Sequence, residues 1–123
     1  MIYEFVYDGP ILTNNEQRRI KNRHALNERI KKIKHAALIL FLSQHKGVKP
    51  TDKRVSVEIW DQCTTANLRD IDAQAPTIKA VLDSLQGVLY DNDSQIKPET
   101  LWGCEKAPDR KNRVIFRFEV HDD

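Results

Sequence analysis

The segment from residue 23 to residue 45 constrains the fold more than any other part of this chain. Its apolar residues recur at helical spacing, at Leu26, Ile30, Ile33 and Ala37. Gly47 follows where a helix would end, and residues 36–42 are apolar nearly all round. A helix that is apolar on every side must be covered on every side, so we expect the chain's own sheet or a second subunit to pack against it.

The rest of the chain predicts strands and one further helix. Alternating apolar and polar residues indicate strands over residues 2–7 and 54–62. We expect two further strands, near residues 94–105 and over residues 114–120. Pro76 is favourable in a first helical turn, and the apolar spacing after it predicts a second, shorter helix that ends before Gly87. We therefore expect one α+β domain over residues 1–123, with a mixed or antiparallel sheet packed on one side by two helices.

A turn and a polar segment separate the first strand from the long helix. Asp8-Gly9-Pro10 ends the alternation, and residues 13–22 are polar and basic. We expect these residues to form a loop that is mobile without its partner.

The composition excludes several classes of protein. The amino terminus lacks the basic region and long apolar core of a signal peptide. The longest apolar run, residues 36–42, is far shorter than the roughly 20 residues of a membrane span. We expect a cytoplasmic protein with no membrane partner and no small-molecule substrate.

The cysteines and histidines do not predict a metal site. Cys63 and Cys104 stand far apart and form no CxxC pair, so neither a zinc site nor a disulfide framework is indicated. The four histidines do not pair at metal-ligand spacing. We expect both cysteines to be buried, reduced thiols.

The charge of the chain is unevenly distributed. The net charge is +2, but residues 1–60 carry 12 Lys and Arg against 6 Asp and Glu, whereas residues 61–123 carry 8 against 12. Such asymmetry indicates a surface for a polyanion near a separate acidic site.

One basic cluster stands out within the first half. It contains a single acid, Glu28, and eight basic residues: Arg18, Arg19, Lys21, Arg23, Arg29, Lys31, Lys32 and Lys34. A charge run is usually a solvated face, but this imbalance fits phosphate binding better. The expected partner is nucleic acid, and because no sequence-reading module is present, we expect contacts mainly to its backbone and shape.

Asp70 and Asp72 are candidate metal ligands. If this stretch is extended, both carboxylates project from the same side, and a hard divalent cation is the usual agent that neutralises such a pair. The alternative is structural: Asp72 caps the following helix, and Asp70 pairs with a base such as Arg69.

A second acidic cluster, Asp91-Asn92-Asp93, follows that helix, and we expect the chain's reversal to bring it back toward Asp70. Such a sequence is also typical of a turn. Lys79 lies one helical turn before Asp83, so it either forms a solvated ion pair or stabilises negative charge at a site.

The ordered set of these segments resembles the RusA family of Holliday-junction resolvases. The resemblance covers nearly the whole chain and rests on five segments around the long helix: an N-terminal strand, Gly9-Pro10-Ile11-Leu12-Thr13-Asn14-Asn15, Arg69-Asp70-Ile71-Asp72, the helical stretch from Lys79 to Leu85, and Asp91-Asn92-Asp93-Ser94-Gln95-Ile96. It implies a homodimer that nicks two strands of a four-way DNA junction symmetrically.

The resemblance also implies roles for single residues. Asp70, Asp72 and Asp93 would hold Mg²⁺, for which Mn²⁺ is a possible substitute, and Lys79 would be essential to catalysis. Asn14, Asn15 and Arg69 would join the basic cluster in contacting DNA. The predicted function is thus a Mg²⁺-dependent endodeoxyribonuclease of DNA recombination and repair.

Two other hypotheses remain. In the first, the chain is a non-catalytic DNA-binding accessory module whose aspartates are structural. In the second, the DxD binds the metal of a sugar-nucleotide transferase, but a chain of this length has no room for a nucleotide-binding domain.

Overall fold

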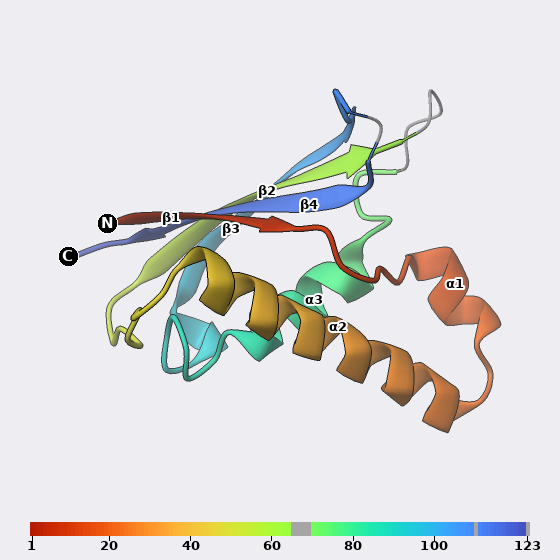
Figure 1. Ribbon diagram of the computed structural model, residues 1–123, viewed down its shortest axis with the longest axis horizontal. Helices are drawn as coiled ribbons and strands as arrows, with labels where there is room; N and C mark the ends of the chain where they lie inside the picture. The colour runs from red at the N-terminus through yellow and green to blue at the C-terminus, as the bar shows by residue number, and fades with distance from the viewer. Residues whose placement is uncertain (65–69, 110, 123) are drawn as a thin grey trace.

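The computed structural model describes residues 1–64, 70–109 and 111–122, which form a four-stranded sheet with its helices on one face (Figure 1). The elements are β1 (Ile2–Tyr7), α1 (Asn14–Arg19), α2 (Arg23–Gln44), β2 (Val55–Cys63), α3 (Ala75–Ser84), the 3₁₀ helix η1 (Asp93–Gln95), β3 (Ile96–Lys106) and β4 (Arg113–Val120). The α+β prediction is confirmed.

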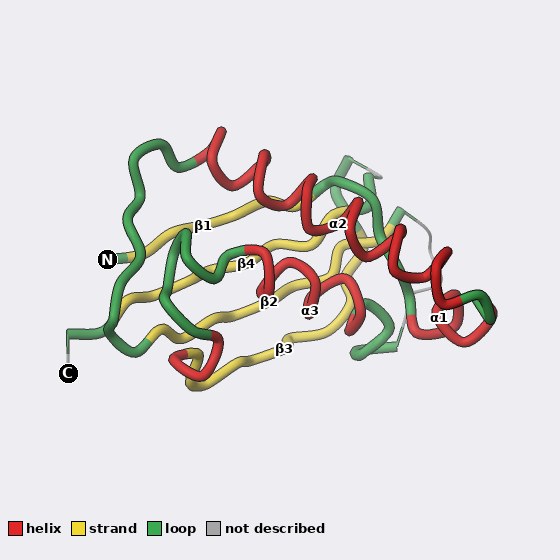
Figure 2. Tube along the Cα trace, turned by 90° about the horizontal axis from the view of Figure 1, so that it is seen from below, coloured by secondary structure: helices red, strands yellow, loops and turns green. Residues whose placement is uncertain are grey.

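The sheet has the order β1-β4-β2-β3 and is mixed. β4 pairs antiparallel with both β1 and β2, whereas β2 and β3 run parallel. A parallel pair requires a crossover connection, and α3 with η1 lies between these two strands in the chain. The helices lie in front of the sheet when it is viewed from below (Figure 2).

The core lies between this sheet and the helices. Alternate residues of β1, β2 and β4 are buried, such as Phe5, Val57 and Phe116. α2 adds Ile33, Ala37 and Phe41 to them, which follow the helical spacing expected from the sequence. The alternation thus predicted both the strands and the face of the sheet that is covered.

The outer face of α2 remains open within this chain. Ile39 and Leu42 are 53% and 44% exposed. The chain's own sheet therefore covers only one side of the apolar half of the helix, and a second subunit on the other side remains a prediction.

α3 is tied to the loop after β1 by a buried threonine. The backbone N–H of Leu12 donates to the Thr77 hydroxyl at 2.8 Å. The same hydroxyl lies 2.9 Å from the Leu12 carbonyl oxygen and 2.7 Å from the side-chain oxygen of Gln74. These contacts satisfy buried polar groups and fix the start of α3 against the loop that leads into α1.

Two sequence-based expectations are wrong. Residues 14–19 of the expected loop form the helix α1, because Thr13 and Glu16 make a capping box that stabilises its first turn. Cys63 and Cys104 form a disulfide instead of separate thiols, because the β2–β3 pairing brings these distant positions together.

Among the described residues, no helix is long and apolar enough to cross a membrane.

The packing of α2 on the sheet leads to a prediction about stability. Phe41 is fully buried, and its ring centroid lies 5.4 Å from that of Phe5. We expect Phe41→Ala to lower the free energy of unfolding by about 3–5 kcal/mol, measured by chemical denaturation. His35→Ala, at an exposed position of the same helix, should change it by no more than about 0.5 kcal/mol. Equal losses from both variants would contradict this packing.

Candidate functional site

Asp70 and Asp72 lie on a turn directly before α3. The N–H of Ala73 donates to the carbonyl oxygen of Asp70, and the N–H of Ala75 to that of Asp72, both at 3.0 Å. The stretch is therefore a turn and not the extended segment that the sequence argument assumed. Asp72 does not cap α3 either, because the N-cap residue is Gln74 and no side chain caps this end.

Both carboxylates line one cavity with the start of α1. This cavity of about 330 Å³, called here the Asp70 cavity, is bounded by Thr13, Asn14, Asn15, Arg18, Asp70, Asp72 and Ala73. The structure thus brings together two predicted metal ligands and three predicted DNA-binding residues from segments far apart in the sequence.

Asn14 joins the two sides of the Asp70 cavity. Its backbone N–H donates to the carbonyl oxygen of Ala73 at 2.9 Å. Its side-chain amide donates to the carbonyl oxygen of Asp72 at 2.8 Å. These two hydrogen bonds hold the turn against α1 and leave the carboxylate of Asp72 free of the Asn14 amide.

α1 is in turn anchored to α2. Thr13 and Glu16 bond each other as the capping box, and the Arg29 guanidinium contacts Glu16 at 3.1 Å and donates to the carbonyl oxygen of Ile11 at 2.7 Å. Burial alone would raise the pKa of Glu16, but hydrogen bonds from Thr13 and Arg29 and the charge of Arg29 together lower it. Arg29, expected to contact DNA, is thus engaged in positioning α1.

Most other members of the basic cluster face solvent. The exposed ones are Arg18, Arg19, Lys21, Arg23, Lys31 and Lys32, whereas Lys34 is half-buried. Asn15 is exposed beside them, and Arg69 lies outside the described residues. Most of the predicted phosphate-binding surface is therefore accessible on α1 and the first half of α2.

Asp93 and Lys79 line a different cavity. This cavity of about 470 Å³, called here the Lys79 cavity, has an apolar floor from Ile59, Ala75, Ile78, Leu82, Ile96 and Leu101 and charged walls from Lys79, Asp83, Asp93 and Glu99. Burial raises the pKa of the neighbouring Tyr90 hydroxyl, and so do the carboxylates of this cavity.

Lys79 forms the ion pair that its spacing allows. Its ammonium lies 3.5 Å from Asp83, and the lysine side chain is 75% exposed. An exposed pair of this kind contributes at most about 1 kcal/mol. The structural interpretation of Lys79 therefore matches its observed contacts.

Asp93 is held at the other end of the parallel strands. Gln95 of η1 donates to the carbonyl oxygens of Thr51 and Lys53, just before β2 begins. Asp70 lines the other cavity, so the two aspartates border different spaces. The return of this segment to Asp70 therefore stays a prediction.

The Asp70 cavity fits a hard cation through two carboxylates. Mg²⁺ prefers oxygen ligands and commonly binds one or two carboxylates together with substrate phosphates and water. Asp70, Asp72 and the amides of Asn14 and Asn15 supply such donors. Among the described residues, the carboxylates of Asp70, Asp72 and Asp93 do not form a group within 4.8 Å of one another; Asp61, Cys63 and Cys104 do.

Two features of this region were not predicted, although the sequence carries a signal for each. Thr13 and Glu16 have the spacing of a capping box, which predicts a helix start there. Asp61 continues the buried row of β2 after Val57 and Ile59, where an apolar residue is expected, so a carboxylate at that position is itself a signal. Glu99 of the Lys79 cavity has no comparable signal.

No protein-family model and no curated protein matches this chain.

The anchoring of α1 predicts a dependence of stability on pH. Because the pKa of Glu16 is lower in the folded chain than its ordinary value of 4.5, its charge stabilises the fold above that value and loses this effect as the pH falls through the lowered pKa. We expect Glu16→Gln to be less stable than the wild type near pH 7, and the difference to shrink below about pH 4 in urea unfolding.

The matched control for this prediction is Glu4→Gln, at an exposed position of β1. It should show no such convergence with the wild type. A Glu16→Gln deficit that stays constant down to pH 3 would show that the carboxylate charge does not anchor α1.

Proposed function

We propose that this chain is a Mg²⁺-dependent, structure-specific endodeoxyribonuclease that resolves four-way DNA junctions by paired symmetric nicks. One observation carries the proposal: Asp70 and Asp72 line the same cavity as Asn14, Asn15 and Arg18. Oxygen ligands for a metal and a cation for phosphate thus border the same space. The resemblance to the RusA resolvases supplies the junction as the substrate.

Each residue of the Asp70 cavity has a role in this proposal. Asp70 and Asp72 hold the metal, and Asn14 keeps their turn in place through its two backbone contacts. Arg18 neutralises a phosphate that enters the cavity. When bound, Mg²⁺ or Mn²⁺ polarises the scissile phosphate and lowers the pKa of an attacking water.

The DNA path follows the exposed basic side chains of α1 and α2. They include Arg18, which lines the Asp70 cavity, and continue along the first half of α2. Binding through phosphates of this kind weakens steeply with salt. It reads the shape of DNA rather than its sequence, as a junction-specific enzyme requires.

Two nicks require two sites, so the proposal includes a homodimer. The exposed apolar side chains of α2, Ile39 and Leu42, supply a surface for the partner subunit. The proposed place of action is the cytoplasm of a bacterial or phage-infected cell, where such DNA junctions arise.

The resemblance also assigns Asp93 to the metal and Lys79 to the stabilisation of negative charge. Ala73 lines the Asp70 cavity and Ala75 lines the Lys79 cavity, so the two cavities border the chain within two residues of each other. These two roles remain predictions, which Asp93→Asn and Lys79→Ala test directly.

The proposal predicts a specific pattern of cleavage. A synthetic four-way junction and a linear duplex of the same sequence are incubated with the protein, in Mg²⁺ and in EDTA. We expect paired nicks in the junction alone, lost in EDTA. Asp70→Asn and Asp72→Asn should lower the rate by at least about 100-fold and leave junction binding intact, because the basic surface is unchanged.

Asp91→Asn is the matched control, since this exposed aspartate lines neither cavity. It should cleave at the wild-type rate. Loss of binding together with cleavage in Asp70→Asn would contradict the separation of metal and phosphate roles.

One observation favours the alternative of a non-catalytic DNA-binding module. Asp93 lies in a different cavity from Asp70, and Lys79 is paired with Asp83. On this alternative the junction stays intact at every metal concentration, while binding remains sensitive to salt.

A further inference from the structure

The row of core-facing side chains on β2 changes character at its carboxyl end. Val55, Val57 and Ile59 are buried and apolar, but the next two positions of the row are Asp61 and Cys63. Both are buried, and Asp61 is 0% exposed. Because side chains two apart project from the same side of a strand, this carboxylate and this sulfur face the same space.

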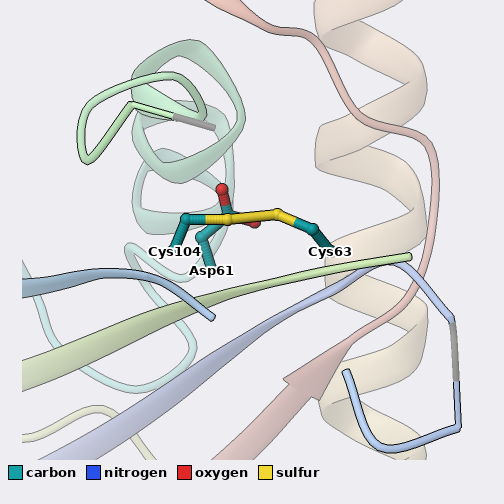
Figure 3. Close-up of side chains that lie close together, drawn as sticks. All are labelled: Asp61, Cys63 and Cys104. Carbon is teal, nitrogen blue, oxygen red and sulfur yellow. A yellow bond between two sulfur atoms is a disulfide. The ribbon is translucent and has the colours of Figure 1, made fainter. Parts of the chain in front are cut away.

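β3 brings a third ligand atom to the same place. Cys104 is the parallel partner of Asp61 in the register of the two strands. The Cα atoms of Cys63 and Cys104 lie 6.8 Å apart, at the wide end of the range for a disulfide. The two sulfurs and a carboxylate oxygen of Asp61 all lie within 4.8 Å of one another. Figure 3 shows the three side chains close together.

We propose that the reduced protein binds Zn²⁺ through Asp61, Cys63 and Cys104, and that the disulfide is the alternative, metal-free state of the same site. Thiolate and carboxylate are both zinc ligands, and three protein ligands leave a fourth position for water. Two strands of one sheet hold the three groups, so little ordering is needed on binding. The inference goes beyond the proposed nuclease activity and does not depend on it.

The two states exclude each other for a chemical reason. The thiolate is the form of cysteine that binds metal, and sulfurs joined to each other have lost that charge. Exchange with a small disulfide such as oxidised glutathione would form the Cys63–Cys104 bond, break the bond of the small disulfide, yield two small thiolates and release Zn²⁺. Two electrons pass from the protein sulfurs to the small disulfide.

The site lies next to the turn that carries Asp70 and Asp72. Gly103 has a φ of +105°, and a Cβ built on it would lie 3.4 Å from Ile71, which stands between the two aspartates. Cys104 follows Gly103 directly. A change between the disulfide and the zinc-bound state at Cys104 therefore takes place directly beside the contact of Gly103 with Ile71.

The test is a metal titration of the full chain. The protein is reduced with a phosphine, freed of metal and titrated with Co²⁺, whose bonds to thiolate give charge-transfer absorption in the near ultraviolet. We expect one Co²⁺ per chain with this absorption, its loss on addition of Zn²⁺, and no such absorption in the oxidised protein. Stoichiometric absorption in the oxidised protein, or none in the reduced and folded protein, would overturn the proposal.

Ligand variants make the test specific. Cys63→Ser and Cys104→Ser should each weaken Zn²⁺ binding by more than the 10- to 100-fold that loss of an outer-shell partner causes. Asp61→Asn keeps both thiolates and should weaken binding at least about 10-fold. The control Asp52→Asn, at an exposed position, should bind as the wild type does.

Circular dichroism checks that each variant folds. If Cys63→Ser does not fold, two variants still test the zinc site: Cys104→Ser, at a half-buried position, and Asp61→Asn. Wild-type affinity in Asp61→Asn would remove the carboxylate from the site and overturn the assignment.

Discussion

The parallel pairing of β2 and β3 is the constraint on which the arrangement of every candidate group depends. Because parallel strands need a crossover, α3 starts after the end of β2 and the chain then returns to the start of that strand. Asp70 and Asp72 are thereby placed at one end of the crossover and Asp93 at the other. The same pairing sets Cys104 against Asp61 and creates the second cluster of ligands.

A chain of polar contacts positions the Asp70 cavity on this framework. Thr77 fixes α3 to Leu12, Asn14 fixes the aspartate turn to α1, and Arg29 fixes α1 to α2 through Glu16. One basic residue of the predicted DNA surface thus serves the architecture, while its exposed neighbours remain available to phosphate. Basic residues that look equivalent in the sequence thus differ in role: Arg29 positions α1, and the exposed members of the cluster are the ones proposed to bind phosphate.

The sequence predicted the fold well, because period-two and helical spacing report directly on burial. The strands, both longer helices and the buried face of α2 follow from residues such as Phe41 and Val57. It predicted the candidate site only in part. Local spacing does not encode the order of the strands, which sets the contacts between distant segments. It therefore could not predict that Asn14 bonds to Asp72, that Asp93 and Asp70 line different cavities, or that the two cysteines pair.

Paramagnetic broadening by Mn²⁺, in nuclear magnetic resonance spectra of the ¹⁵N-labelled protein, reports whether Asp70 and Asp72 bind a divalent cation. At substoichiometric Mn²⁺, the amide signals of Asn14, Asn15 and Asp72 should broaden first, and Asp70→Asn should remove the effect. Broadening centred on Asp83 and Asp93, or unchanged in Asp70→Asn, would show that Asp70 and Asp72 do not form the cation site.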